Sequence, residues 1–195
     1  MQPVMIYTEA SPNPNSMKFV LNFELVPDGL SFDYPDLAST QVEGKSSPLA
    51  TDLFQFPFVR RVFLASNFIT VTKDEATDWG EVIFDTKQFI KIYFEENHPV
   101  FEQKTIHKHT TILDTDSDTI RKIKSVLDDY VRPAVESDGG AIAFHSFDEA
   151  AGSVKVLLQG SCSGCPSSTL TLKAGIQNLL AQMVPEVKEV VAEGV

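Results

Sequence analysis

The sequence predicts an α+β protein of two small domains. Its hydrophobic share of 43%, with 14 phenylalanines, is enough apolar material for packed cores rather than disorder. Strand-like runs and helix-like periods occur together in both halves of the 195 residues, a length at which one or two domains are expected. Residues 98–115 show no clear period, so we predict a linker there, between domains at 1–97 and 116–195.

The first domain is predicted to begin with two strands of a mixed β-sheet, over residues 4–8 and 17–23. The turn between them, residues 11–15, is dense in Pro and Asn and cannot continue a strand ladder. Residues 24–46 are predicted to form a loop, because Pro27 to Gly29 and Gly44 interrupt any regular structure.

Helices are expected to pack on this sheet. Ser47 is placed to cap a short helix over 48–55, with proline at its first position. A hairpin follows, with strands over 62–64 and 68–72. A second helix is predicted over 79–96, capped by Asp78 and stopped by Asn97-His98-Pro99, with apolar residues at helical spacing. Two aromatic residues of this helix are interpreted as core packing, Trp79 and Phe89.

The second domain opens with the clearest amphipathic pattern in the chain. A helix is predicted from Asp118 as its cap, and its apolar positions are Ile120, Ile123, Val126, Leu127, Tyr130, Val131, Ala134 and Val135. Pro133 lies within this pattern and is expected to bend the helix or leave a carbonyl unpaired. Asp138-Gly139-Gly140 ends it, because glycine can adopt the left-handed conformation of a helix cap.

The rest of the second domain predicts an antiparallel pair, a loop, a helix and a last strand. The pair covers 141–147 and 154–158, the loop 160–165, the helix 166–183 and the last strand 187–191. The predicted element order is therefore α-β-β-α-β.

Two cysteines, Cys162 and Cys165, are the only ones in the chain. A tetrahedral zinc or cubane iron–sulfur site usually takes four protein ligands, so this pair forms half of such a site and a second copy of the chain could supply the rest. Gly164 permits a turn between them. Pro166 is suited to begin a helix whose N-terminal dipole favours thiolates. The small neighbouring residues predict an exposed, labile site.

Three interpretations of the cysteine pair remain open at this point. A dithiol redox site of thioredoxin type would follow an early parallel strand, whereas this pair follows an antiparallel one. An inert structural pair is disfavoured, because Ser- and Gly-rich surroundings suit metal ligation better than burial. A metal or cluster site shared across a dimer is favoured, and the spacing alone does not choose zinc or an iron–sulfur cluster.

Composition excludes several other classes of function. The formal charge is −11 and no basic face is evident, so nucleic acid is not an expected partner. No apolar run of about 18 residues predicts a membrane helix. The first nine residues lack the pattern of a signal or transit peptide, so the predicted location is cytoplasmic. Phosphate-loop and Ser/His/Asp motifs are not recognised.

The remaining candidate side chains have ordinary structural explanations. His98, His107 and His109 are interpreted as part of a solvated linker, since no third ligand completes a metal site. His145 is predicted to lie on the surface of a strand. Asp138 precedes two glycines at a helix end and is interpreted as turn chemistry.

Both halves of the sequence resemble the Nfu/NifU family of iron–sulfur cluster scaffolds and carriers. In the second half, the resemblance is carried by Arg132-Pro133, Asp138-Gly139-Gly140, Gly160 to Lys173 and Gly175-Ile176. In the first half, it is carried by Thr8 to Phe19, Ser47 to Ala50, Leu53-Phe54, Val62-Phe63, Phe68 to Lys73 and Trp79. The resemblance implies that 1–97 is an Nfu N-terminal domain and that 116–195 is a NifU-like, cluster-binding domain.

The resemblance also implies a function. Cys162 and Cys165 match the ligand positions of the family, so they are expected to bind a 4Fe–4S cluster shared across a homodimer. The protein would accept the cluster from an upstream assembly scaffold and transfer it to apo iron–sulfur client proteins, acting as a carrier and not as an enzyme. The alternatives are a dithiol oxidoreductase and a zinc-bridged dimer that use the same cysteines.

Overall fold

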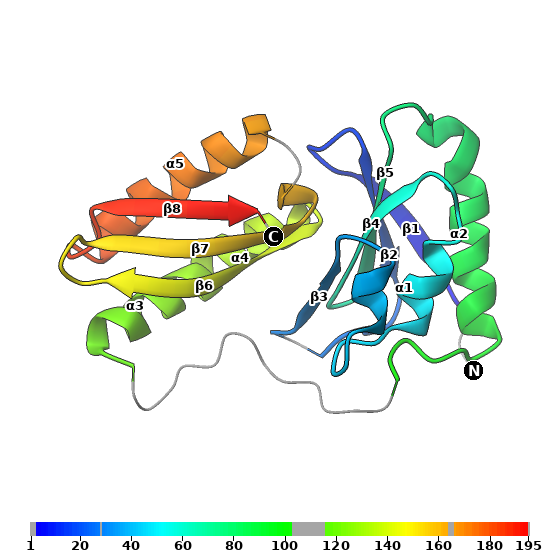
Figure 1. Cartoon of the computed structure of the whole chain (residues 1–195), viewed down its shortest axis with the longest axis horizontal. Helices are drawn as coiled ribbons and strands as arrows, with labels where there is room; N and C mark the ends of the chain where they lie inside the picture. The colour runs from blue at the N-terminus through cyan, green and yellow to red at the C-terminus, as the bar shows by residue number, and fades with distance from the viewer. Residues whose placement is uncertain (1–2, 28, 103–115, 164–165, 195) are drawn as a thin grey trace. The chain divides into compact units, whose positions relative to one another are not determined.

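The computed structural model of the chain describes residues 3–27, 29–102, 116–163 and 166–194, without the side chains of residues 163 and 166–170. The chain divides into two compact units, Met1–His107 and Lys108–Val195, each with its own sheet (Figure 1). The predicted α+β class is confirmed. Among the described residues, no helix is both long and apolar enough to cross a membrane.

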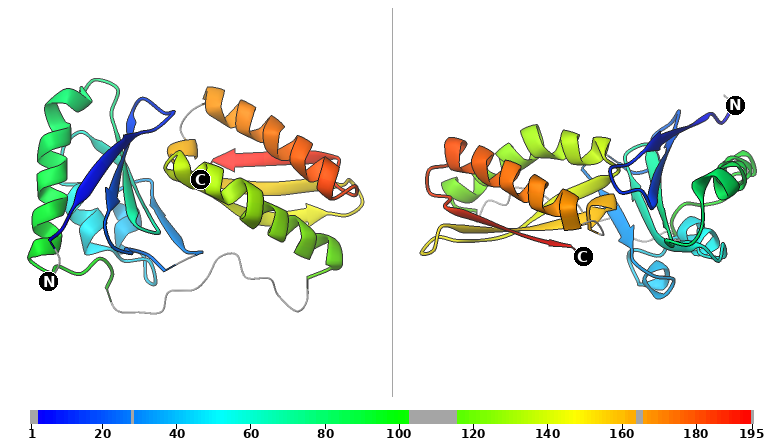
Figure 2. Two further views of the ribbon diagram at one scale, coloured as in Figure 1. Left: turned by 180° about the vertical axis from the view of Figure 1, so that it is seen from behind. Right: turned by 90° about the horizontal axis from the view of Figure 1, so that it is seen from above.

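The first unit is built on a five-stranded sheet with strand order β1-β2-β5-β4-β3. All of its pairings are antiparallel, so this sheet is not mixed. Helices α1 and α2 pack against it (Figures 1 and 2). The elements are β1 (Ile6–Ala10), β2 (Ser16–Leu21), β3 (Ser31–Tyr34), η1 (Ala38–Gln41), α1 (Pro48–Leu53), β4 (Val59–Ala65), β5 (Phe68–Lys73) and α2 (Trp79–Glu95).

Local capping fixes where both helices of this unit begin, as predicted. The Ser47 hydroxyl accepts a hydrogen bond from the Ala50 amide at 3.2 Å, and the Asp78 carboxylate accepts one from the Gly80 amide at 2.6 Å. Each bond satisfies a donor that the first helical turn leaves unpaired. Trp79 and Phe89 are partly buried against the core, as expected.

Residues 24–46 differ from the predicted loop because they contain strand β3 and the short helix η1. In β3, Phe32 and Tyr34 point into the core and are 5% and 0% exposed. The strand has only four residues, between turn-forming segments, so its alternation is too short to be recognised without its partner. Pairing with β4 over Ser31 to Tyr34 makes it a strand.

Residues 98–102 pack on the first unit, although the linker was predicted to begin at 98. The Ser47 hydroxyl donates to the Val100 carbonyl at 2.7 Å, and the Glu102 amide donates to the Ser46 carbonyl at 3.1 Å. The Phe101 ring lies 4.5 Å from that of Phe32, centroid to centroid. The rest of the predicted linker, 103–115, lies outside the described residues.

The second unit has a three-stranded sheet whose helices cover one face (Figure 2). The pair β6-β7 is antiparallel and the pair β7-β8 is parallel, in the predicted order α-β-β-α-β. The elements are α3 (Asp118–Val126), the π-helical turn η2 (Leu127–Val131), α4 (Arg132–Ser137), β6 (Gly140–Asp148), β7 (Ser153–Gly160), η3 (Ser161–Ser163), α5 (Pro166–Met183) and β8 (Glu189–Gly194).

Proline 133 explains the irregular centre of the first helix in this unit. Proline has no amide hydrogen to donate within the helix, and the turn before it is a π-helix in which the Arg132 amide donates to the Leu127 carbonyl. A π-turn absorbs an extra residue without ending a helix. The N-cap is Ser117, which accepts from the Ile120 amide at 3.3 Å, one residue before the predicted Asp118.

Candidate functional site

Cys162 lies at the junction between the central strand and the last helix of the second unit. Strand β7 ends at Gly160, whose φ of 67° turns the chain out of the sheet. The short helix η3 carries Cys162, and α5 begins at Pro166. The predicted start of this helix is therefore confirmed. Cys165 lies outside the described residues.

The Asp138-Gly139-Gly140 segment, called here the glycine corner, holds the residues beside Cys162. The Ser161 hydroxyl donates to the Asp138 carbonyl at 2.6 Å, and the Ser161 amide donates to the Gly139 carbonyl at 3.3 Å. Gly139 has a φ of 83°, which side chains rarely adopt. The two motifs singled out in the sequence therefore form one structure, although Asp138 and Ser161 are 23 positions apart in the sequence.

Gly140 leaves the space that the Cys162 side chain fills. A Cβ atom at position 140 would lie 2.9 Å from the Cys162 sulfur and 2.6 Å from the Gln159 carbonyl oxygen. Both distances are shorter than real contacts to a Cβ atom allow. Glycine is thus required by close packing, in addition to any turn.

Cys162 is buried, which differs from the exposed site that the small neighbouring residues predict. Its side chain is 6% exposed, and that of Ser161 is 2% exposed. Cys162 belongs to the core cluster of this unit, together with Ile142, Leu158 and Ile176. Small residues in a loop do not expose a thiol when strands and helices distant in sequence cover it. The Cys162 sulfur also lies 3.9 Å from the Ser161 hydroxyl oxygen.

The Ser161–Asp138 hydrogen bond and close packing against Gly140 fix the position of the Cys162 thiol. Thiolates are the ligands that iron–sulfur clusters and structural zinc prefer. The Ser161 hydroxyl donates its one hydrogen to the Asp138 carbonyl, so it acts on Cys162 by holding the segment that carries it. Ser161 and Gly140 were not predicted as site residues. The sequence signal that could have identified Ser161 and Gly140 was the presence of Asp-Gly-Gly and Gly-Ser-Cys together in the stretch that resembles the family.

The other candidate side chains do not converge on Cys162 within the described residues. His145 is exposed on β6, as predicted. His98 is exposed, with its Nε2 atom 2.9 Å from the Glu96 carboxylate and its ring against Tyr93. His107 and His109 lie outside the described residues. In the described part of the chain, no three His, Cys, Asp or Glu side chains form a group that could hold a metal.

Two family profiles match the chain in sequence order. The family described as "Scaffold protein Nfu/NifU N terminal" matches residues 6–97, and the family described as "NifU-like domain" matches residues 123–191. The second match contains the glycine corner and Cys162.

The chain is also similar over nearly its whole length to fly proteins named "NFU1 iron-sulfur cluster scaffold homolog, mitochondrial". It is 41% identical to the protein of Drosophila willistoni over 187 residues, which is 96% of this chain and 63% of that protein. Identity is 40% to the proteins of Drosophila persimilis and Drosophila grimshawi, over 96% and 95% of this chain and 64% and 60% of theirs. The chain therefore spans less than two thirds of the length of these relatives.

The predicted cytoplasmic location is wrong, because these relatives are named as mitochondrial proteins. The prediction used only the pattern of the first residues. A compartment address is a short segment read separately from the folded domains, so the first residues of a chain shorter than its relatives carry no conclusion about location.

Proposed function

We propose that this chain, which belongs to the Nfu/NifU family of iron–sulfur cluster scaffold proteins, binds a cluster through Cys162 and Cys165. It then delivers the cluster to apo-proteins. The observation that carries this proposal is the position of Cys162. The glycine corner and Ser161 hold it at the strand–helix junction of the NifU-like domain. The relatives' names favour the mitochondrion as the compartment.

A chain with two cysteines supplies half of the four thiolates that a cubane cluster takes. We infer that two chains contribute Cys162 and Cys165 each and share one 4Fe–4S cluster. The cluster itself then supplies part of the bonding in the homodimer, since a ligand that binds only the assembled state stabilises that state.

Division of labour between the domains is part of the proposal. Residues 116–195 form the cluster-binding domain, residues 1–97 form a domain for contacts with partners, and a linker joins them. An upstream assembly scaffold donates the cluster, and apo iron–sulfur proteins receive it. The cluster is cargo, and no bond of a substrate is made or broken catalytically.

Transfer of the cluster is a ligand exchange without net oxidation or reduction. A client thiol loses its proton and its sulfur bonds to iron, while the iron–sulfur bond to Cys162 or Cys165 breaks and the released thiolate takes up a proton. Four such exchanges move the cluster. Because the Cys162 side chain is buried, it must become accessible before its sulfur can bind iron and before a client thiol can replace it.

Anaerobic reconstitution with iron and sulfide tests the proposal. We expect about two iron and two sulfide per chain in a dimer, as one 4Fe–4S cluster shared by two chains requires. Cys162→Ser should remain folded and fail to retain the cluster. Retention of a normal cluster by Cys162→Ser would refute the ligand assignment.

The alternatives give different results in the same measurements. About one iron per chain would indicate a shared 2Fe–2S cluster. Colourless protein loaded with zinc in place of iron would indicate a zinc-bridged dimer. Turnover of a disulfide substrate by protein that never retains iron would indicate a dithiol oxidoreductase.

A further inference from the structure

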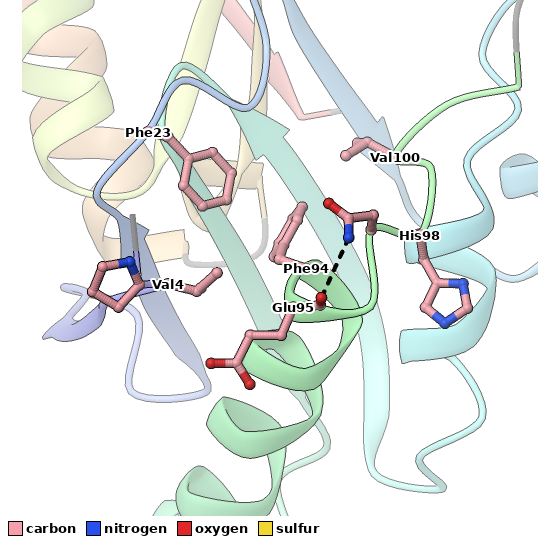
Figure 3. Close-up of a pocket in the computed structure, with 8 residues that line it drawn as sticks. Val4, Phe23, Phe94, Glu95, His98 and Val100 are labelled. Atoms are coloured by element: carbon pink, nitrogen blue, oxygen red, sulfur yellow. Dashed lines mark hydrogen bonds between the residues drawn. The ribbon is translucent and has the colours of Figure 1, made fainter. Parts of the chain in front are cut away.

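A pocket in the first unit, at the C-terminal end of α2, is unrelated to the cysteine site. Its volume is about 690 Å³. Figure 3 shows side chains from the N-terminal segment, the loop after β2, the end of α2 and the segment after it converging on this space. The lining includes the apolar residues Val4, Phe23, Phe94 and Val100 and the polar residues Glu95 and His98. The lining comes from segments far apart in sequence.

The apolar walls of the pocket are held by defined contacts. The Asn22 side chain accepts from the Met5 amide at 3.0 Å and donates to the Pro3 carbonyl at 3.1 Å, which fixes the N-terminal wall. The rings of Phe23 and Phe94 meet edge to face with centroids 5.1 Å apart. A pocket that exists before binding costs less ordering of side chains when a ligand enters.

The rim of the pocket is acidic. Glu95 and Glu96 stand at the C-terminal end of α2, where the helix dipole is negative, and the last turn of this fully described helix has no basic residue. Glu95 meets Lys91 only at 3.7 Å, and Glu96 meets His98 at 2.9 Å. Two further exposed carboxylates lie close in sequence to lining residues: Glu24 follows Phe23, and Glu102 is two residues after Val100. A cation is therefore favoured beside the apolar space.

An exposed apolar side chain extends this surface. Ile92 is 50% exposed and lies one turn before Glu95 and Glu96 on α2. Residues three or four apart on a helix are neighbours, so Ile92 stands beside the acidic rim. Exposed apolar groups rimmed by charge are typical of surfaces that bind other proteins.

We propose that this pocket binds a segment of a partner protein that carries a bulky apolar side chain next to lysine or arginine. The apolar side chain enters the pocket and packs against its apolar lining of Val4, Phe23, Phe94 and Val100, and its basic neighbours meet Glu95 and Glu96. The inference does not depend on the cluster, because every residue that carries it lies in the first unit.

Binding of a defined peptide to the full chain tests this proposal. The probe is a fluorescein-labelled peptide of sequence Gly-Lys-Lys-Leu-Phe-Leu-Lys-Lys-Gly, followed by anisotropy, and its counterpart has Glu in place of every Lys. We expect the lysine peptide to bind and the glutamate peptide to bind at least about tenfold more weakly, a difference of about 1.4 kcal/mol.

Two matched double variants separate the pocket from general attraction to an acidic protein. Glu95→Lys with Glu96→Lys reverses the rim, and Glu75→Lys with Glu81→Lys makes the same change of net charge near the other end of α2, roughly 20 Å away along the helix. We expect the rim variant to weaken binding about tenfold. The distant variant should change it less than about twofold, since salt screens charges beyond about 8 Å.

A further variant tests the apolar part of the site. Ile92→Ser changes an exposed side chain and should weaken binding about threefold, in line with the area of one exposed apolar group. Urea unfolding followed by the fluorescence of Trp79, the single tryptophan, shows that each variant is folded. Equal weakening by both double variants, or equal binding of both peptides, would overturn the proposal, as would no binding of the lysine peptide at millimolar concentration.

Discussion

The cores of the two units are made of different side chains, and only the second core contains the proposed cluster ligand, Cys162. The first unit contains twelve of the fourteen phenylalanines, the only tryptophan and three of the four tyrosines, and many of their rings contact one another. The second unit packs mainly aliphatic side chains, and Cys162 is one member of that core.

This contrast shows why the two units should respond differently to substitution. In the first unit the charged residues of the proposed binding pocket, Glu95 and Glu96, are exposed at the end of α2. They can therefore be substituted without disturbing the aromatic core. In the second unit the proposed ligand Cys162 is itself a core residue. Changes in packing there should alter both the free energy of unfolding and access to the thiol.

The largest expected effect comes from opening a cavity in the aromatic core. Phe19 is fully buried, and its ring lies 6.3 Å from that of Trp79. Phe19→Ala should lower the stability of the first unit by about 3–5 kcal/mol. Urea unfolding followed by Trp79 fluorescence measures this loss. Iron uptake by the second unit should persist, and an equal loss of iron uptake would show that the units are not energetically separate.

A smaller effect is expected when the glycine corner is filled. Gly140→Ala would place a Cβ against Cys162 and the Gln159 carbonyl, and such overpacking costs about 1–3 kcal/mol. Gly175→Ala is the matched control, because it lies exposed in α5 with open space around it and should stabilise the helix by about 0.5–1 kcal/mol.

Thermal unfolding followed by circular dichroism measures the stability of the Gly140→Ala and Gly175→Ala variants. The rate at which iodoacetamide alkylates Cys162 measures how accessible the thiol is in each variant. Gly140→Ala should label faster than the parent and Gly175→Ala more slowly. Peptide fragmentation in mass spectrometry distinguishes Cys162 from Cys165. Equal behaviour of the two alanine variants would remove the packing role of Gly140.

Loss of one hydrogen bond at the corner should have a still smaller effect. Ser161→Ala removes the donor to the Asp138 carbonyl, which is worth about 1 kcal/mol, so labelling of Cys162 should rise about fivefold. Ser137→Ala, at an exposed position beside the same corner, is expected to change labelling little. If the two variants label alike, Ser161 does not restrain Cys162.

Alkaline pH should lower the stability of the first unit. Burial raises the pKa of Tyr93 to about 12 and also raises that of Tyr34. Unfolded tyrosine titrates near 10, so between about pH 10 and 12 the unfolded chain releases protons that the folded first unit keeps. Stability is therefore full below pH 10 and falls as pH rises.

Trp79 fluorescence during urea unfolding at pH 8, 10 and 11 measures the alkaline loss. Tyr93→Phe should flatten the decline above pH 10, although it also removes the hydrogen bond to the Pro99 carbonyl and so lowers stability at pH 8. A decline of the same slope in Tyr93→Phe would exclude Tyr93 as a source.

Much of the fold follows from local signals that act over a few residues. Ser47 and Asp78 cap the helices that follow them, and Pro166 begins α5. The hairpin of β4 and β5 turns at Ser66, whose φ is 43°. The glycine corner ends α4 where the sequence predicts. These features are predictable because caps and turns are satisfied by neighbours in sequence.

The cysteine site shows where sequence and tertiary structure each decide. The sequence by itself determined the two thiols, their spacing, the helix after them and the family they belong to. Only the tertiary structure decided that β3 is a strand, that β8 runs parallel to β7, and that Cys162 is buried against Gly140. Burial depends on segments such as Ile142 and Ile176, and no local pattern shows which distant residues will cover a side chain.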